Sequence, residues 1–119
     1  MRVIAGAARG IPLKTPEGLR TRPTAERVKE GLFSAIQFEI PGARVLDLFA
    51  GSGQLGIEAL SRGAKSGVFV DTGPEACRLV RENLQRTGLT SQAQVMQADY
   101  LQFLAHCHGP FDIIFLDPP

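Results

Sequence analysis

The sequence lacks long apolar runs, repeats and more than a few cysteines. No apolar stretch approaches the roughly 20 residues that a membrane-spanning helix needs, and there is no internal repeat or low-complexity tract. Residues 1–5 lack the basic-then-apolar pattern of a secretion signal, which predicts a cytoplasmic protein. Cys77 and Cys107 are too few for a disulfide framework or a zinc cluster, so we expect free thiols. The 119 residues, 44% of them hydrophobic, predict one soluble domain or part of one.

Net charge is also small, but the charges are unevenly distributed along the chain. The net charge is +1, and residues 1–44 hold eight Lys and Arg against four Asp and Glu, whereas residues 45–119 hold five against eight. The basic front end favours contact with a polyanion, although a solvated surface has the same composition. The predicted contact residues are Arg2, Arg9, Lys14, Arg20 and Arg22.

The first 23 residues predict a β-hairpin and a basic arm. Residues 2–5 and 11–14 are short strand candidates on either side of a glycine-bearing loop. Residues 15–23 are rich in turn formers, and Pro16 and Pro23 restrict the residues before them. This stretch is therefore predicted to be an ordered loop or a flexible arm.

A first helix is predicted over residues 25–38. Thr24 is a good N-cap, Glu26 sits in the first turn, and Pro41 with Gly42 ends the segment. The apolar face expected in the core consists of Val28, Leu32, Ala35 and Ile36.

From residue 43 onwards, strand and helix patterns alternate. The predicted strands are residues 44–49, 67–70, 93–97 and 111–116, and the predicted helices are residues 54–62, 74–88 and 100–104. This series is typical of an α/β fold with a parallel sheet and helices on both faces. Right-handed crossovers with the common order 3-2-1-4 place the fourth strand beside the first. We expect residues 24–119 to form this Rossmann-like domain.

The segment from residue 45 to residue 56 is the strongest candidate for a ligand site. Its strand is apolar except for Asp47, and burying an unpaired carboxylate costs on the order of several kcal/mol. Asp47 is therefore expected at the carboxyl end of the strand, where a loop or a cationic ligand satisfies it. Gly51 and Gly53 supply backbone freedom in the turn, and Gly56 allows close packing of helix on strand.

Two cofactors compete for this turn. Residues 51–56 match the dinucleotide fingerprint, and Asp71, 20 residues beyond Gly51, suits a ribose-hydroxyl acceptor for a nicotinamide dinucleotide or for S-adenosylmethionine. A pyrophosphate favours helix N–H groups without a nearby acid, whereas the ammonium group of S-adenosylmethionine can bind Asp47. The methyl donor is favoured, and a nicotinamide-dependent oxidoreductase is the alternative.

Asp117, Pro118 and Pro119 follow the last predicted strand. Open parallel sheets bind ligands beyond the carboxyl ends of their strands, so Asp117 should face the same crevice as Asp47. The prolines stiffen the backbone, and the Asp117 carboxylate with the Pro118 carbonyl can hold both hydrogens of a substrate amine. The nitrogen lone pair would then be aimed at a sulfonium methyl group. A base within a nucleic-acid helix would have to be flipped out to reach such a site.

Four segments distributed over the whole chain carry a resemblance to a known family. They are residues 2–6 with 9–10, residues 21–24 with 27–28 and 32–33, residues 47–53, and residues 117–119. Together they resemble the bacterial ribosomal RNA guanine-N2 methyltransferases that modify the small subunit. The resemblance implies an S-adenosylmethionine-dependent enzyme that methylates 16S ribosomal RNA, in small ribosomal subunit particles, and we expect it to be a monomer without a metal.

The resemblance also implies roles for individual residues. Residues 47–53 would hold the methionine moiety, Asp71 the ribose hydroxyls, and Asp99 with Tyr100 the adenine. The implied cofactor-binding residues are Arg22, Thr24, Asp47, Phe49, Ala50, Gly51, Ser52, Gly53, Asp71, Thr72, Asp99 and Tyr100, and the implied catalytic residues are Asp117, Pro118 and Pro119.

The chain departs from the family pattern in two ways. The family continues with an aromatic residue and further strands after the two prolines, so we expect this chain to be a fragment or a truncated reading frame. Residues 71–74 are less typical, although Asp71 is retained. A cofactor-binding or RNA-binding fragment without turnover is therefore another alternative, and a DNA amine remains open because the Asp-Pro-Pro motif serves several bases.

Plainer interpretations compete with some of these assignments. Asp71 and Asp99 are also suited to cap the helices that follow them. His106, Cys107 and His108 do not predict a metal site, because consecutive ligands point apart and a fourth is missing.

Overall fold

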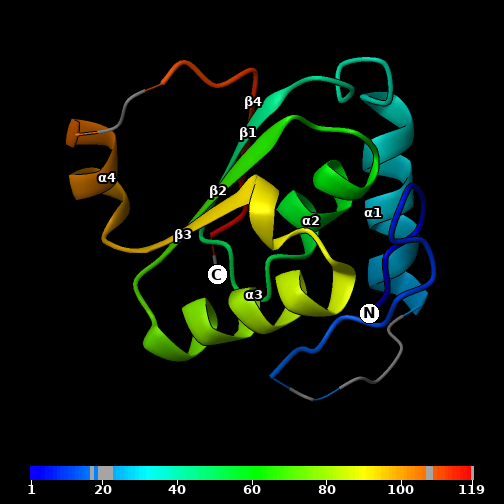
Figure 1. The fold of residues 1–119 in the computed structure, drawn as a ribbon, viewed down its shortest axis with the longest axis horizontal. Helices are drawn as coiled ribbons and strands as arrows, with labels where there is room; N and C mark the ends of the chain where they lie inside the picture. The colour runs from blue at the N-terminus through cyan, green and yellow to red at the C-terminus, as the bar shows by residue number, and fades with distance from the viewer. Residues whose placement is uncertain (17, 19–22, 107–108, 119) are drawn as a thin grey trace.

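The computed structural model describes residues 1–16, 18, 23–106 and 109–118. Its elements are α1 (Pro23–Ala35), β1 (Arg44–Leu48), α2 (Gln54–Ser61), β2 (Ser66–Asp71), α3 (Pro74–Thr87), the 3-10 turn η1 (Thr90–Gln92), β3 (Ala93–Gln97), α4 (Tyr100–His106) and β4 (Ile113–Leu116). The four strands form one parallel sheet in the order β3-β2-β1-β4, which confirms the predicted α/β topology (Figure 1). None of the described helices is long and apolar enough to cross a membrane.

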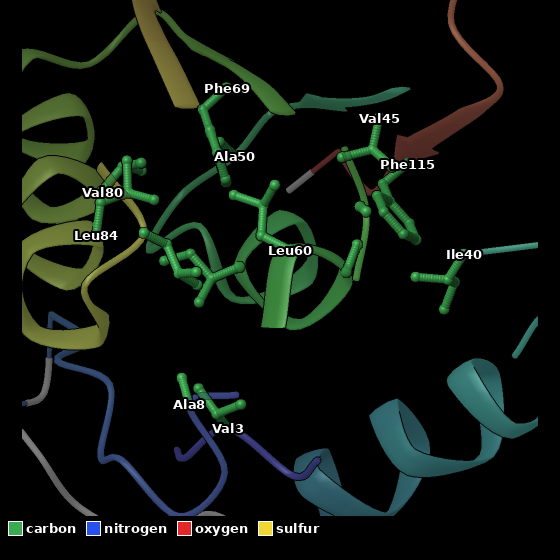
Figure 2. Close-up of a cluster of buried hydrophobic side chains, with 14 of the residues drawn as sticks. Val3, Ala8, Ile40, Val45, Ala50, Leu60, Phe69, Val80, Leu84 and Phe115 are labelled. Carbon is green, nitrogen blue, oxygen red and sulfur yellow. The ribbon is translucent and has the colours of Figure 1, made fainter. Parts of the chain in front are cut away.

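The sheet separates two hydrophobic clusters. Because side chains alternate along a strand, Val45, Phe69 and Phe115 face the larger cluster, to which α2 and α3 contribute (Figure 2). On the opposite face, Leu46 and Leu48 belong to a smaller cluster with Phe103 of α4. Figure 1 accordingly shows α4 on the opposite side of the sheet from α1, α2 and α3. The sheet is covered unequally, and the first face carries the main core.

The N-terminal segment pairs with itself as predicted, but over a short distance. Arg2 and Pro12 form a single antiparallel bridge, and the Val3 N–H donates to the carbonyl of Ile11 at 3.0 Å. The segment packs closely against α2. The contact is so close that a Cβ at Gly6 would overlap the carbonyl oxygen of Ser61. The hairpin therefore belongs to the same core as the larger domain.

The predicted start of α1 and most of its predicted buried face are wrong, although Ile36, which follows the helix, packs against the core as predicted. The helix begins at Pro23, so Thr24 lies within the first turn and is not its N-cap. Val28 is 69% exposed and Leu32 is 40% exposed, whereas Lys29 and Phe33 of the same helix are buried. The physical reason for the buried face is Glu58, a charged partner on α2.

Glu58 of α2 accounts for the buried charged face of α1. Its carboxylate, 0% exposed, pairs with the Nζ of Lys29 at 3.2 Å and with the Nε of Arg62 at 2.8 Å. It also accepts the backbone N–H groups of Ile4 at 2.9 Å and Ala5 at 3.1 Å. A charge this deeply buried is tolerated only when it is paired and hydrogen-bonded in this way. Glu58 thus joins α1, α2 and the N-terminal segment.

Gly56→Ala is expected to destabilise the protein by about 1–3 kcal/mol through overpacking. A Cβ at Gly56 would lie 2.7 Å from Cζ of Phe69 and 3.2 Å from Oδ2 of Asp47, which leaves no room for a methyl group. The matched control is Gly31→Ala in α1, where a Cβ meets nothing within 4 Å. Denaturant unfolding should show a loss for the first variant only, and equal stabilities of the two variants would contradict this packing.

Candidate functional site

The carboxyl ends of β1, β2 and β4 meet at one cavity of about 330 Å³. Asp47, Asp71 and Asp117, one from each of these strand ends, all line it, as the predicted strand order required. The other predicted cofactor-binding residues that line the cavity are Phe49, Ala50, Gly51, Ser52 and Thr72. The structure therefore brings most of the predicted site together.

Asp47 is a buried acid whose side chain faces this cavity. It is 2% exposed, and its Oδ2 accepts the N–H of Gly56 at 3.0 Å. No Lys, Arg or His among the described residues forms an ion pair with it. Burial raises the pKa of Asp47 to about 7, the Gly56 N–H opposes this rise, and the charges of Asp117 and Asp71 add to it. The site thus holds an acid that a cationic ligand would stabilise in its ionised form.

The turn after β1 has an unusual backbone. Gly51 and Gly53 have φ values of +59° and +81°, as expected for glycines in the left-handed region. Phe49 has φ +57°, which is costly for a bulky residue and indicates that its surroundings hold it there. A Cβ at Gly53 would lie 3.2 Å from the methyl groups of Val80. Gly53 is therefore buried against α3, and it does not itself line the cavity.

Asp71 fixes the turn to the end of β2. Its Oδ2 accepts the N–H of Gly51 at 3.0 Å, and its Oδ1 accepts the N–H of Gly73 at 2.9 Å. A carboxylate has about four acceptor positions, so each oxygen keeps capacity for a ligand hydroxyl. Asp71 thus serves the turn and still faces the cavity. Sequence spacing alone pointed to a ribose contact and did not reveal the bond to Gly51.

Asp99 and Tyr100, which were predicted to bind the cofactor, do not line the cavity. Asp99 accepts the N–H groups of Leu101 at 3.1 Å and Gln102 at 3.4 Å, so it caps α4. The Tyr100 ring centroid lies 5.2 Å from that of Phe49, which lines the cavity. Their contact with an adenine stays a prediction.

Asp117 connects the first cavity with a second one. It lines a neighbouring cavity of about 550 Å³, which lies between α1 and β4 and includes Val28 and Leu116. Gln54 at the start of α2 lines both cavities. A substrate group entering from the second cavity would therefore meet Asp117 before it reached Asp47.

The structure describes three of the five predicted basic contact residues, Arg2, Arg9 and Lys14. Arg2 pairs with Glu26 at 3.3 Å, Lys14 pairs with Glu82 at 3.3 Å, and Arg9 is exposed. Several predicted site residues fall outside what the structure describes. They are Arg20, Arg22 and Pro119, together with the side chain of Thr24. Cys107 and His108, for which no metal site was predicted, also lie outside the described residues.

Sequence reasoning missed Asn83, which supports the turn from α3. Asn83 is 0% exposed, and its Nδ2 donates to the carbonyl oxygen of Ser52 at 2.9 Å. The available signal was a polar residue next to Leu84 and three positions after Val80, on the apolar side of the predicted helix. A polar group at such a position is buried only with partners.

Comparisons with known proteins identify a family to which this chain is similar over its whole length. The model of the family described as "Conserved hypothetical protein 95" matches residues 1–119. The YlbH protein of Bacillus subtilis is 48% identical over 100% of this chain, which covers 66% of YlbH. A Haemophilus influenzae protein named "Ribosomal RNA small subunit methyltransferase D" is 44% identical over 100% of this chain, which covers 63% of that protein. The chain thus spans slightly less than two thirds of the length of these relatives.

A solved structure of similar sequence has the same fold. The yhhF protein of Escherichia coli matches with a TM-score of 0.86 at 37% identity, over 100% of this chain and 64% of that one. This likeness and the strand order β3-β2-β1-β4 confirm the Rossmann-like architecture predicted from the sequence.

Proposed function

The chain belongs to the family described as "Conserved hypothetical protein 95", and we propose that it transfers a methyl group from S-adenosylmethionine to the exocyclic N2 amine of a guanine in small-subunit ribosomal RNA. The name of the Haemophilus influenzae relative supports a ribosomal RNA substrate. Because the chain covers only 63% of that relative, its activity and substrate are proposals for this chain.

The observation that carries the proposal is the environment of Asp47. A buried acid that faces a cavity and has no cationic partner among the described residues suits a ligand that brings its own cation. The ammonium group of S-adenosylmethionine is such a cation. A dinucleotide fits worse, because its pyrophosphate would enter a cavity lined by Asp47, Asp71 and Asp117.

The residues of the chain have separable tasks at this site. Asp47 would bind the ammonium group, and the free acceptor positions of Asp71 would bind the ribose hydroxyls. S-adenosylmethionine, when bound, supplies an electrophilic methyl group. The Asp117 carboxylate and the Pro118 carbonyl would accept the two hydrogens of the guanine amine, which orients its nitrogen lone pair. Positioning then provides most of the rate enhancement, and no strong base is needed.

The front end of the chain would contact the RNA. Arg9 is exposed, and Arg2 and Lys14 carry partly exposed charges although each pairs with a carboxylate, Arg2 with the buried Glu26 and Lys14 with the partly exposed Glu82. Such charges attract a phosphate backbone. We further propose that the protein acts as a monomer in the cytoplasm, on RNA within small ribosomal subunit particles.

The deciding experiment measures transfer of a labelled methyl group from S-adenosylmethionine to deproteinised small-subunit RNA and to assembled small subunits. Nucleoside digestion should place the label on N2 of guanine. Label on another base would refute the guanine assignment. Tight binding of a nicotinamide dinucleotide without binding of S-adenosylmethionine would favour the oxidoreductase, and cofactor binding without transfer to either RNA would favour a non-catalytic fragment.

A further inference from the structure

Asn83 joins the N-terminal segment to the turn that lines the cavity of Asp47, Asp71 and Asp117, which is called the cofactor cavity. Its Nδ2 donates to the carbonyl oxygens of Lys14 at 2.8 Å and Ser52 at 2.9 Å, and its Oδ1 accepts the N–H of Lys14 at 2.8 Å. Lys14 lies 69 residues from Asn83 along the chain, and Ser52 lies 31 residues away. Only one orientation of the amide fits, because the Lys14 N–H can only donate and the two carbonyls can only accept.

On the cofactor side, Asn83 holds the centre of the turn. Ser52 lies between Gly51 and Gly53, which both have positive φ values. Asp71 binds the N–H of Gly51 from the side of β2, and Asn83 binds the carbonyl of Ser52 from the side of α3. The turn is therefore fixed at two adjacent residues by side chains from different elements.

On the other side, Lys14 belongs to the basic front end. Its Nζ pairs with Glu82 at 3.3 Å, and both side chains are partly exposed, at 46% and 41%. Lys14 lines a cavity of about 630 Å³ together with Arg78, Gly51 and Ser52. Gly51 and Ser52 thus form part of the walls of this cavity and of the cofactor cavity.

We propose that Asn83 couples RNA contact at Lys14 to cofactor binding at the turn. The inference rests on the proposed function. An RNA phosphate that replaces Glu82 as the partner of the Lys14 side chain orders the backbone at this position. Asn83 binds both polar backbone groups of Lys14, so it passes this ordering to Ser52. Each ligand then prepares part of the site of the other, and each raises the affinity of the other by the same factor.

The test compares cofactor affinity with and without RNA. The dissociation constant of S-adenosylhomocysteine, a non-reacting probe, is measured alone and with saturating small-subunit ribosomal RNA. In the wild type the RNA should tighten binding by about fivefold or more. Asn83→Ala should bring the ratio to about one, whereas Gln85→Ala, an exposed position on the same helix, should keep the wild-type ratio. The ratio of the dissociation constants without and with RNA distinguishes coupling from a structural role. A variant that is only less stable, but still folded, keeps the wild-type ratio.

A measurement on the unmodified protein covers the case in which Asn83→Ala does not fold. Hydrogen exchange of the Lys14 N–H should slow by about fivefold or more when S-adenosylhomocysteine is added without RNA. The Gly42 N–H, bonded to the carbonyl of Gly63 away from this network, should not change. Probe binding with unchanged Lys14 exchange, or a retained affinity ratio in folded Asn83→Ala, would overturn the coupling. Failure of the wild type to bind the probe would instead refute the proposed function.

Discussion

Asp117→Asn is expected to lower the rate constant of methyl transfer by about a hundredfold, while the affinity for S-adenosylmethionine stays within about threefold. The amide has the shape of the carboxylate, but it can present an N–H group where the substrate amine needs an acceptor. Asp117 lies between the two cavities, so the change should affect the amine and spare the cofactor. Single-turnover transfer and equilibrium binding separate these two effects.

Asp112→Asn is the matched control for this substitution. Asp112 accepts the N–H of Arg44 at 2.8 Å where β1 and β4 begin, at the edge of the sheet away from the carboxyl ends of the strands. It does not line any of the three cavities near the turn. Its loss should leave the transfer rate nearly unchanged. If Asp117→Asn transferred methyl groups as fast as Asp112→Asn, Asp117 would not hold the amine.

The sheet could be predicted from the sequence because local patterns determine it. Gly88 ends α3 with φ +73°, and Pro74 begins it at the first helical position, as each residue type favours. The strand β3 occupies the predicted residues 93–97. Alternating strands and helices then leave few possible connections, so the order of the strands followed from general rules.

The buried face of α1 could not be predicted in the same way. A helical pattern assigns charged residues to solvent, yet Lys29 is buried because Glu58 of α2 neutralises it. In the sequence, Glu58 is an ordinary polar residue of a predicted helix, and only the tertiary structure places it beside Lys29. A contact between distant segments decides which face of such a helix is buried, and the local helical pattern does not contain that information.

In the candidate site, too, features that follow from local patterns were predictable, and contacts between distant segments were not. The carboxylates at the strand ends were predictable, because parallel strands bring their carboxyl ends to one edge. The bonds that fix the turn were not, since Asp71 reaches back to Gly51 and Asn83 reaches across to Ser52. Sequence reasoning therefore identified the groups that line the cavity better than the groups that hold the turn in place.

The buried acid Asp47 should make the stability of the free protein depend on pH, and Asp47→Asn should remove that part of the dependence. The pKa of Asp47 is about 7 in the folded protein, against an ordinary value of 3.8, so between these pH values the folded state retains a proton that the unfolded state has lost. The free energy of unfolding should therefore fall as the pH rises from about 4 to 7, by up to about 1.4 kcal/mol per pH unit and on the order of 4 kcal/mol in total. Denaturant unfolding of the two proteins at several pH values measures the difference, and parallel profiles would contradict the raised pKa.

The same proton should oppose cofactor binding at low pH. The ammonium group of S-adenosylmethionine needs ionised Asp47, which burial and the neighbouring Asp71 and Asp117 disfavour below about pH 7. The affinity should therefore rise by about tenfold between pH 6 and pH 8 in the wild type. Asp47→Asn cannot ionise, so its affinity should be independent of Asp47 titration and about tenfold to a hundredfold weaker at pH 8, which corresponds to a lost charge-assisted hydrogen bond. Calorimetric titration at each pH measures both effects. A wild-type affinity that did not change between pH 6 and pH 8 would show that the ammonium group binds elsewhere.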